Sequence, residues 1–459
     1  MGERIERDAL GEVRVPEDAL YGAETVRAVG NFRITGRPPR TAVVRALAQI
    51  KEAAAGANAK VGALDTEIAD AIVQAARDVA EGKHADQFLV DRYQAGAGTS
   101  LHMNVNEVIA NLAEELLGGR RGEHKRVHPN DHVNMAQSSN DVFPTATRVA
   151  VLAESGKLLA ALDQLAEAFD GRAEAFARVV KSGRTHLQDA VPITLGQEMA
   201  AYAAMIRRAR DRVDETGRTR VARLPLAGTA TGTGFGAPDG YREEVIPRLA
   251  ELTGLPLVTA DDLIEAVRNH GDLGEYGAAL KAAAVAVGQV TDDLRLLSMG
   301  PRTGLAEIRL PEVQPGSSMM PGKVNPSIPE MVNMVCMRVS GAEHTVALAV
   351  AGGQLDMNVM TPVIADELLE AIDLLAAASR TLAEKCVSGI EADEERCKEY
   401  AEASLGLATA LRPALGYAGA ADVAVEAYRS NRTLKEVVRE KKLLPEDQVD
   451  EVLEPVRYT

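Results

Sequence analysis

The sequence predicts a mainly α-helical protein, and three observations support this fold class. Aromatic residues make up only 3% of the 459 residues and tryptophan is absent, so Ala, Leu, Val and Met must build the core. These residues suit close-packed helices better than sheets, which favour β-branched and aromatic side chains. Apolar residues recur at three- and four-residue spacing over long stretches, which is the period of a helix. Alternating patterns typical of strands are few.

The first predicted domain, residues 1–140, is mixed but mainly helical. Short extended pieces and turns are expected first, followed by a helix from Thr41 and a second over 66–81. The small, hydroxyl-bearing stretch 93–100 leads into another helix. Gly118-Gly119 should end that helix, because glycine adopts the backbone conformation that terminates helices.

The second predicted domain, residues 141–390, contains long helices. We expect them after Pro144, after the polar stretch 181–189, and from Leu263 onward. Their apolar positions cover more than one face, so these helices should be buried among others, and oligomeric bundling is expected. Residues 391–459 are more charged and more broken, which predicts a small C-terminal helical domain.

Composition narrows the function classes. Lys and Arg total 51 and Asp and Glu total 67, so the net charge is −16, which disfavours binding to nucleic acid or to anionic membranes. The three cysteines show no metal-ligand spacing and are expected to be buried, reduced thiols. The N-terminus lacks an apolar signal core, and no apolar run of about 18 residues appears. We expect a soluble cytoplasmic protein with no cofactor and no bound metal.

The loop 316–326 has neither helical nor strand periodicity. The segment 301–329 holds six of the twenty prolines of the chain. The loop carries the hydroxyls of Ser317 and Ser318, the ammonium of Lys323 and the amide of Asn325, a set suited to recognising a small anion. Ser327 and Glu330 after it predict a capping box that opens the next helix.

Three further stretches place polar groups inside apolar sequence: Thr99-Ser100, Ser138-Ser139-Asn140 and Thr185-His186. Many neutral donors and one cation can hold a dicarboxylate. Taken alone, 138–140 is more typical of a turn and a helix N-cap, and 185–186 could equally begin a capped helix. The glycine-threonine run 228–236 lacks the preceding strand and the Gly-Lys-Ser/Thr ending of a phosphate loop, so that interpretation is rejected.

These stretches resemble, in order, the motifs of the aspartase/fumarase superfamily, and the resemblance covers nearly the whole chain. The matching residues are Gly98-Thr99-Ser100 with Met103-Asn104 and Asn106-Glu107, then Gln137 to Asp141, Gly183 to Gln197, and Gly316 to Pro326. Ile328-Pro329-Glu330, Gly353-Gln354-Leu355 and Asn358-Val359-Met360 resemble the aspartase branch. Two positions depart from it: Ser139 stands where aspartases usually have threonine, and His102 where the family commonly has asparagine.

The resemblance implies a three-domain helical fold in which four copies pack their middle domains into one bundle and three subunits assemble each active site. It also implies reversible anti-elimination of ammonia from L-aspartate to give fumarate. The implied roles are Ser317 as general base, Lys323 and Asn325 on the carboxylate that gains charge, and Thr99, Ser138 and Ser139 on the other carboxylate. Asn140 and His186 would surround the amino group, Thr185 and Ser318 would complete the substrate-binding set, and Glu330 (paired with His186) and His102 would support it.

Other interpretations remain open. Within the family, the chain could be a class II fumarase that hydrates fumarate to malate. It could also be a lyase for an N-substituted or modified aspartate. His102, which stands where the family commonly has asparagine, suggests this interpretation. His128, Asn130 and Asp131 match a second dicarboxylate site of fumarases. A catalytically silent helical tetramer is the alternative from a different class, and the presence of Ser317 and Lys323 argues against it.

Overall fold

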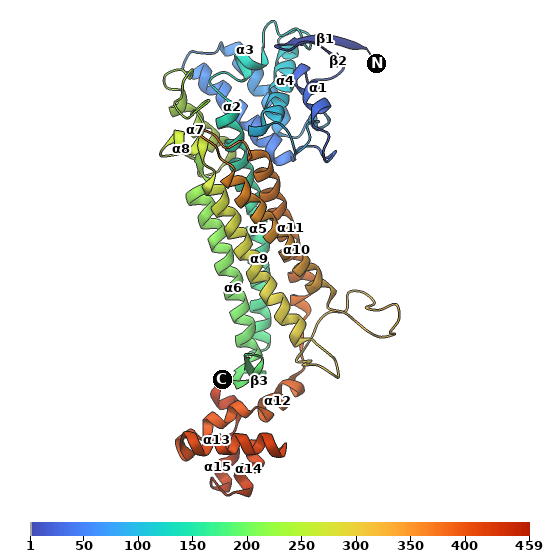
Figure 1. Cartoon of the computed structure of the whole chain (residues 1–459), viewed down its shortest axis with the longest axis vertical. Coiled ribbons are helices and arrows are strands. Elements are labelled where there is room, and N and C mark those ends of the chain that lie inside the picture. The colour runs from blue at the N-terminus through green and yellow to red at the C-terminus, as the bar shows by residue number, and fades with distance from the viewer. Residues whose placement is uncertain (1) are drawn as a thin grey trace. The chain divides into compact units, whose positions relative to one another are not determined.

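Two compact units make up the protein in the computed structural model, which describes residues 2–459. Unit 1 contains Met1–Leu159, Asp211–Ala284 and Met337–Leu375; unit 2 contains Ala160–Arg210, Val285–Cys336 and Ala376–Thr459. Helices dominate both units, so the predicted mainly α fold class is confirmed (Figure 1). The division into three domains remains a prediction. Among residues 2–459, no helix combines the length and apolar character needed to cross a membrane.

The long helices contribute segments to both units. They are α5 (Ser139–Ala175), α6 (Leu195–Thr216), α9 (Gly271–Leu297), α10 (Ser327–Ala351) and α11 (Thr361–Lys385). Within unit 1, the hydroxyls of Ser155 on α5 and Tyr276 on α9 lie 2.5 Å apart. Within unit 2, the rings of Phe169 on α5 and Tyr202 on α6 pack edge to face, with their centroids 5.7 Å apart. In each unit the long helices therefore pack side by side.

Pro144 does not precede the first long helix, as the sequence predicted, but lies inside it. The helix begins at Ser139 because the Ser138 hydroxyl accepts a hydrogen bond from the Asn140 backbone N–H at 3.3 Å and caps the first turn. Pro144 removes only one backbone donor close to the helix start, where the cost is small compared with burying α5.

The remaining elements of unit 1 are short helices and two small strand pairs. The strands are β1 (Glu3–Asp8) with β2 (Gly11–Pro16), antiparallel, and β5 (Arg223–Leu224) with β6 (Val258–Thr259), parallel. The helices are α1 (Ala23–Asn31), α2 (Thr41–Lys60), α3 (Thr66–Ala80), α4 (Thr99–Leu116), α7 (Tyr241–Thr253) and α8 (Leu263–Arg268). Helix α2 packs against α3, α4 and α7 and buries a run of alanines, which lets these helices approach closely.

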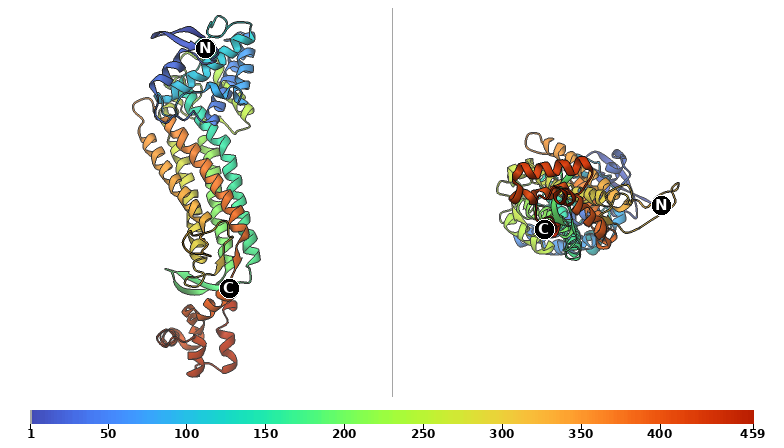
Figure 2. Two further views of the ribbon diagram at one scale, coloured as in Figure 1. Left: turned by 90° about the vertical axis from the view of Figure 1, so that its right-hand side faces the viewer. Right: turned by 90° about the horizontal axis from the view of Figure 1, so that it is seen from below.

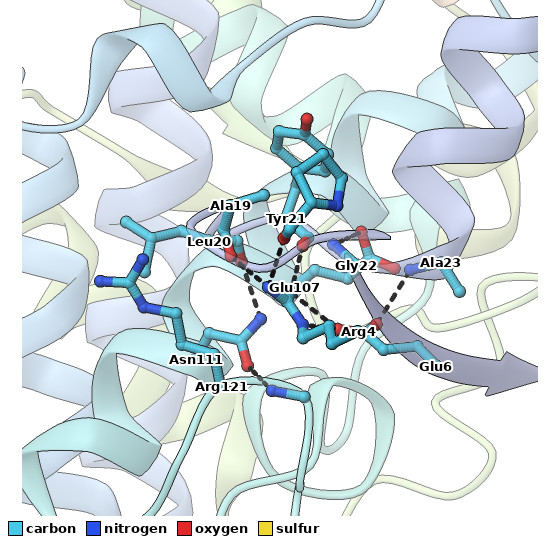
Figure 3. Close-up of polar contacts among 12 residues, drawn as sticks. Arg4, Glu6, Ala19, Leu20, Tyr21, Gly22, Ala23, Glu107, Asn111 and Arg121 are labelled. Atoms are coloured by element: carbon cyan, nitrogen blue, oxygen red, sulfur yellow. Dashed lines mark hydrogen bonds and ion pairs between the residues drawn. The ribbon is translucent and has the colours of Figure 1, made fainter. Parts of the chain in front are cut away.

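A polar cluster fixes α4 to the N-terminal segment (Figure 3). Glu107 on α4 is buried and accepts backbone N–H bonds from Gly22 at 2.9 Å and Thr25 at 3.2 Å. Glu107 thereby caps α1, whose own N-cap is a glycine without a side-chain acceptor. Arg4 donates to four backbone carbonyls before α1, and Asn111 donates to the Leu20 carbonyl at 2.8 Å. The position of α4, which begins at Thr99, is therefore set by buried polar contacts.

Unit 2 contains a β-hairpin and the C-terminal helices. The hairpin is β3 (Val180–Thr185) with β4 (Gln188–Thr194), and β7 (Ile308–Arg309) pairs with β8 (Glu391–Ala392). The helices are α12 (Glu394–Ala403), α13 (Arg412–Ser430), α14 (Leu434–Glu440) and α15 (Glu446–Val452). Helices α13 to α15 gather in one cluster, as two further views show (Figure 2), around a core that includes Leu411, Val437 and Leu453.

Replacing Glu107 by Gln tests the cap on α1. The amide keeps the shape but has one acceptor oxygen instead of two, so at least one buried N–H loses its partner. We expect the free energy of unfolding to fall by about 1–3 kcal/mol, measured by denaturant titration. Glu115→Gln on the same helix is the control, because its ion pair with Arg121 is solvent-exposed and should contribute little. Equal effects of the two substitutions would contradict the proposed cap.

Candidate active site

The starts of α4 and α5 bring two groups of candidate residues together in unit 1. His102 lies on α4 one turn after Thr99, and its Nδ1 atom is 2.7 Å from the Ser139 hydroxyl at the start of α5. Gly98 permits this approach: its φ is +68°, and a Cβ atom there would lie 2.1 Å from the Phe143 ring. Thr99 is exposed at the first position of α4.

The hydroxyl turn before α5 is held by a buried carboxylate. Asp141 is fully buried and accepts the backbone N–H of Ser138 at 2.9 Å and of Thr229 at 3.0 Å. Burial raises the pKa of Asp141 to about 7, against the lowering effect of these donors. The Asn140 amide nitrogen donates to the Ala230 carbonyl at 2.8 Å. The turn and N-cap predicted for 138–140 are confirmed, and the glycine-threonine run serves to dock against them.

The loop 316–326 in unit 2 is closed at its neck and exposed at its tip. The Gly316 N–H donates to the Lys323 carbonyl at 2.9 Å, and the Asn325 amide donates to the Gly316 carbonyl at 2.6 Å. A Cβ atom on Gly316 would lie 2.4 Å from the Lys323 carbonyl oxygen, so close backbone approach requires this glycine. Ser318 and Lys323 are exposed.

The Ser317 hydroxyl oxygen is the acceptor for two backbone donors. The N–H groups of Met319 and Met320 lie 3.1 Å and 2.9 Å from Ser317 Oγ. Two N–H dipoles aimed at one oxygen favour negative charge on that oxygen. The loop therefore provides Ser317 with part of what a serine base requires.

The prediction that Thr185-His186 could begin a capped helix is wrong. These residues end β3 and form the tip of the hairpin with β4. His186 and Leu187 have φ of 56° and 58°, as a two-residue hairpin turn of the type I′ kind requires. Neither residue is of the Asn-Gly type usual there, and such left-handed pairs cost energy that the surrounding structure must supply. Thr185 and His186 are both exposed.

A buried ionic group anchors the base of this hairpin. Glu307 is fully buried and lies 3.1 Å from Lys181 Nζ and 2.9 Å from Arg184 Nη1. Lys181 also pairs with Glu198 on α6 at 2.8 Å. Because removing one partner would leave a buried charge uncompensated, these contacts hold the hairpin firmly beneath its tip.

The predicted capping box at the start of α10 is wrong. The helix already includes Ser327, whose backbone N–H donates to the Asn325 carbonyl at 2.8 Å, while the Ser327 hydroxyl is buried without a partner. Glu330 is half-buried. Among residues 2–459, no hydrogen bond or ion pair joins Glu330 to His186, so that pairing stays a prediction. Nor does one join His186 to the loop of Ser317, although both lie in unit 2.

The residues matching a second dicarboxylate site have a local structural use. His128 Nδ1 accepts the backbone N–H of Asn130 at 3.2 Å and of Asp131 at 3.3 Å. The imidazole thereby caps the short helical turn Pro129–Val133. No group of three or more His, Cys, Asp or Glu side chains within residues 2–459 is arranged to hold a metal ion.

Sequence reasoning missed Lys51 on α2. Its side chain is fully buried and lies 2.6 Å from Nε2 of His102, behind the hydroxyl turn. The available signal was a lysine inside the mostly apolar stretch 46–57, on a helix face that periodicity places in the core. Its hydrogen-bond partners His102, Asn134 and Gln137 come from distant segments, so they could not be recognised before folding was known.

Comparisons with known proteins agree with the motifs. The family model described as Lyase matches residues 11–341, and the model described as Fumarase C C-terminus matches residues 407–459. An aspartate ammonia-lyase from Pseudomonas aeruginosa is 48% identical, with 98% of this chain and 96% of the relative covered.

Two solved structures extend the match to three dimensions. A fumarate lyase:delta crystallin from Brucella melitensis bound to cobalt has a TM-score of 0.96 at 47% identity. A recombinant class II fumarase from Schistosoma mansoni has a TM-score of 0.97 at 38% identity. Both alignments cover 99% of each chain. The protein is therefore a lyase of the aspartase/fumarase superfamily.

Proposed function

We propose that the protein is a carbon-nitrogen lyase that catalyses the reversible anti-elimination of ammonia from L-aspartate to give fumarate, with Ser317 as general base. The observation that carries this proposal is the pair of backbone N–H groups on Ser317 Oγ. Similarity to aspartate ammonia-lyases at 44–48% identity over nearly the full length supports the choice of substrate.

The base must remove a weakly acidic proton from the carbon beside a carboxylate. A free serine hydroxyl ionises far too weakly at neutral pH, so its oxyanion needs donors, a nearby cation and exclusion of water. The N–H groups of Met319 and Met320 supply the donors. Closure of the exposed loop over substrate would exclude water and complete the base.

The same loop offers groups for the carboxylate on which charge develops. The Lys323 ammonium is exposed and, within residues 2–459, makes no side-chain hydrogen bond or ion pair, so it is available to a ligand. Asn325 uses one amide N–H to close the loop neck and retains the other for substrate. The Ser318 hydroxyl adds a further donor. A cation and fixed donors would stabilise the dianionic intermediate more than the ground state.

Unit 1 would bind the other carboxylate. Thr99, Ser138 and Ser139 present hydroxyls at the starts of α4 and α5, where helix N-termini also favour negative charge. The Asn140 amide nitrogen donates to the Ala230 carbonyl, and its amide oxygen would accept from the substrate ammonium. We assign Thr185 and His186, at the exposed hairpin tip, to the end of the substrate that carries the ammonium. Glu330 would support His186.

We further propose that the chain forms a cytoplasmic homotetramer in which different copies complete each site. On α10, Met334 and Met337 are 67% and 72% exposed and Leu348 is 62% exposed, which is a large apolar stripe for one helix face. Cys386 and Cys397 are buried thiols, as expected in a reducing compartment.

Class II fumarase activity is the second candidate, and two observations favour it. The Schistosoma mansoni fumarase matches in fold, and Ser139 follows the fumarase pattern. Incubation with aspartate, malate and N-substituted aspartates in turn, followed by fumarate absorbance, separates the candidates. Fumarate released from malate alone would replace the aspartate lyase proposal by fumarase. Fumarate released from an N-substituted aspartate alone would make that compound the proposed substrate.

Ser317→Ala should reduce kcat by roughly 100- to 10,000-fold, the range for loss of a general base, with the oligomer intact. Fumarate formation measures the rate, and light scattering measures the mass. Ser318→Ala is the matched comparison, because it removes one proposed substrate donor but leaves the base, so kcat should fall less than in Ser317→Ala. Wild-type turnover in Ser317→Ala would remove Ser317 as the base.

Lys323→Ala should raise KM for aspartate and weaken succinate binding by at least about tenfold, since one charge-assisted contact contributes about 1.5–3 kcal/mol. Calorimetry with succinate checks this without turnover. Lys125→Ala is the control, because this lysine is exposed and pairs with the neighbouring Glu123. Unchanged succinate affinity in Lys323→Ala would exclude the assigned role.

Replacing Met334 and Met337 together by Glu should convert the tetramer to smaller species, because charges would enter an apolar interface. Sedimentation or light scattering measures the mass. Val425→Glu on α13 is the control, since this exposed apolar residue lies on a different helix. A double variant that stays tetrameric would show that this face does not form the interface.

A further inference from the structure

Lys51 is a buried charge that the proposed mechanism does not use. It lies on α2 among residues that are almost all apolar, and its side chain is fully buried. A lone ammonium in such a place is costly unless every N–H has a partner. The contacts of Lys51 therefore indicate its protonation state.

Three polar atoms surround Lys51 Nζ. Nζ lies 2.6 Å from His102 Nε2, 3.0 Å from Asn134 Oδ1 and 2.8 Å from Gln137 Oε1. The amide orientations follow from their own contacts: Asn134 Nδ2 donates to the Gln137 carbonyl, and Gln137 Nε2 donates to two backbone carbonyls at 3.1 Å. Both amide oxygens therefore face Lys51. An ammonium has three donors and no acceptor, so a charged Lys51 can donate to both amide oxygens and to His102 Nε2.

The ammonium determines the tautomer of His102. When Lys51 is an ammonium, Nε2 can only accept from it and carries no proton, so the neutral ring carries its proton on Nδ1. Burial, and then the nearby Lys51 charge, lower the pKa of His102, which keeps the ring neutral. Burial lowers the pKa of Lys51 well below its usual range, and the nearby Asp141 carboxylate acts in the opposite direction. The geometry favours the ammonium, because hydrogen-bond acceptors lie within reach of its donors.

The proton on His102 Nδ1 sets the role of the Ser139 hydroxyl. Nδ1 lies 2.7 Å from Ser139 Oγ, so the imidazole donates and the hydroxyl oxygen accepts. The hydroxyl proton of Ser139 then remains free to donate. A substrate carboxylate can only accept hydrogen bonds, so this is the orientation that binding requires.

We propose, resting on the function proposed above, that Lys51 is a positioning residue which acts through the Nδ1–H tautomer of His102 to present Ser139 as a donor to the substrate carboxylate. A neutral Lys51 amine would reverse the donor and acceptor roles along this series of hydrogen bonds. It would accept from Nε2–H, Nδ1 would accept from Ser139, and the hydroxyl would offer lone pairs to an anion.

Neutron diffraction of the deuterated protein tests the proton arrangement independently of activity. We expect three deuterons on Lys51 Nζ and one on His102 Nδ1, with none on Nε2. A deuteron on Nε2 overturns the proposal. This result does not depend on whether the protein releases fumarate. Failure of the proposed reaction can therefore be distinguished from failure of the proposed proton arrangement.

A double-mutant cycle tests whether Lys51 acts through Ser139. Lys51→Met should weaken aspartate or succinate binding by about tenfold, with a smaller change in kcat. In the Ser139→Ala background, Lys51→Met should cause no further loss, because the hydroxyl it orients is gone. Lys181→Met, which removes another buried lysine, should remain additive with Ser139→Ala. Additive losses for Lys51 as well would overturn the proposal.

A second pair of variants covers the case in which Lys51→Met does not fold. His102→Asn can still donate an amide N–H near the position of Nδ1, whereas His102→Leu cannot. We expect His102→Asn to retain most of the succinate affinity and His102→Leu to lose about tenfold, like Ser139→Ala. Equal affinity in the Asn and Leu variants would contradict a donor role for position 102.

Discussion

A buried charge must find a full set of hydrogen-bond partners, and in this protein that requirement fixes the segments that carry the candidate site. Glu107 caps α1 and thereby positions α4, Asp141 holds the hydroxyl turn before α5, and Glu307 anchors the hairpin of His186. Each carboxylate has at least one donor from a segment distant in sequence. The segments are therefore held by interactions that are costly to break one partner at a time.

The candidate groups differ in how firmly the protein holds them in the absence of a ligand. The hydroxyls of unit 1 sit on helix starts with buried partners behind them, so their positions need no ligand. The loop of Ser317 is fixed only at its neck, by Gly316 and Asn325, while its tip and Lys323 face solvent. This division suits an enzyme that first captures one carboxylate on rigid donors and then completes the base as a loop closes. Local donors also offset the net charge of −16, which would otherwise repel a dianion.

Sequence periodicity predicted the mainly helical fold because long apolar repeats leave little choice of structure. The hairpin β3–β4 was missed because its turn, His186-Leu187, lacks the glycine or asparagine that usually marks left-handed backbone. The capping box at Ser327 failed because the loop carbonyl of Asn325 already occupies the N–H that the box would use. The candidate site residues were predicted from motifs, whereas Lys51 could not be, because its surroundings are brought together only by folding. The three-domain division and the residue roles remain predictions.

The donors on Ser317 belong to the main chain, and this has a consequence for how the sequence can vary. Every amino acid except proline supplies the N–H groups now provided by Met319 and Met320. Both side chains are largely exposed, so neither is constrained by a core. Substitutions other than proline at residues 319 and 320 can therefore keep the two N–H donors on Ser317. In the proposed enzyme, side chains at the loop tip can change while the main chain keeps both donors on Ser317.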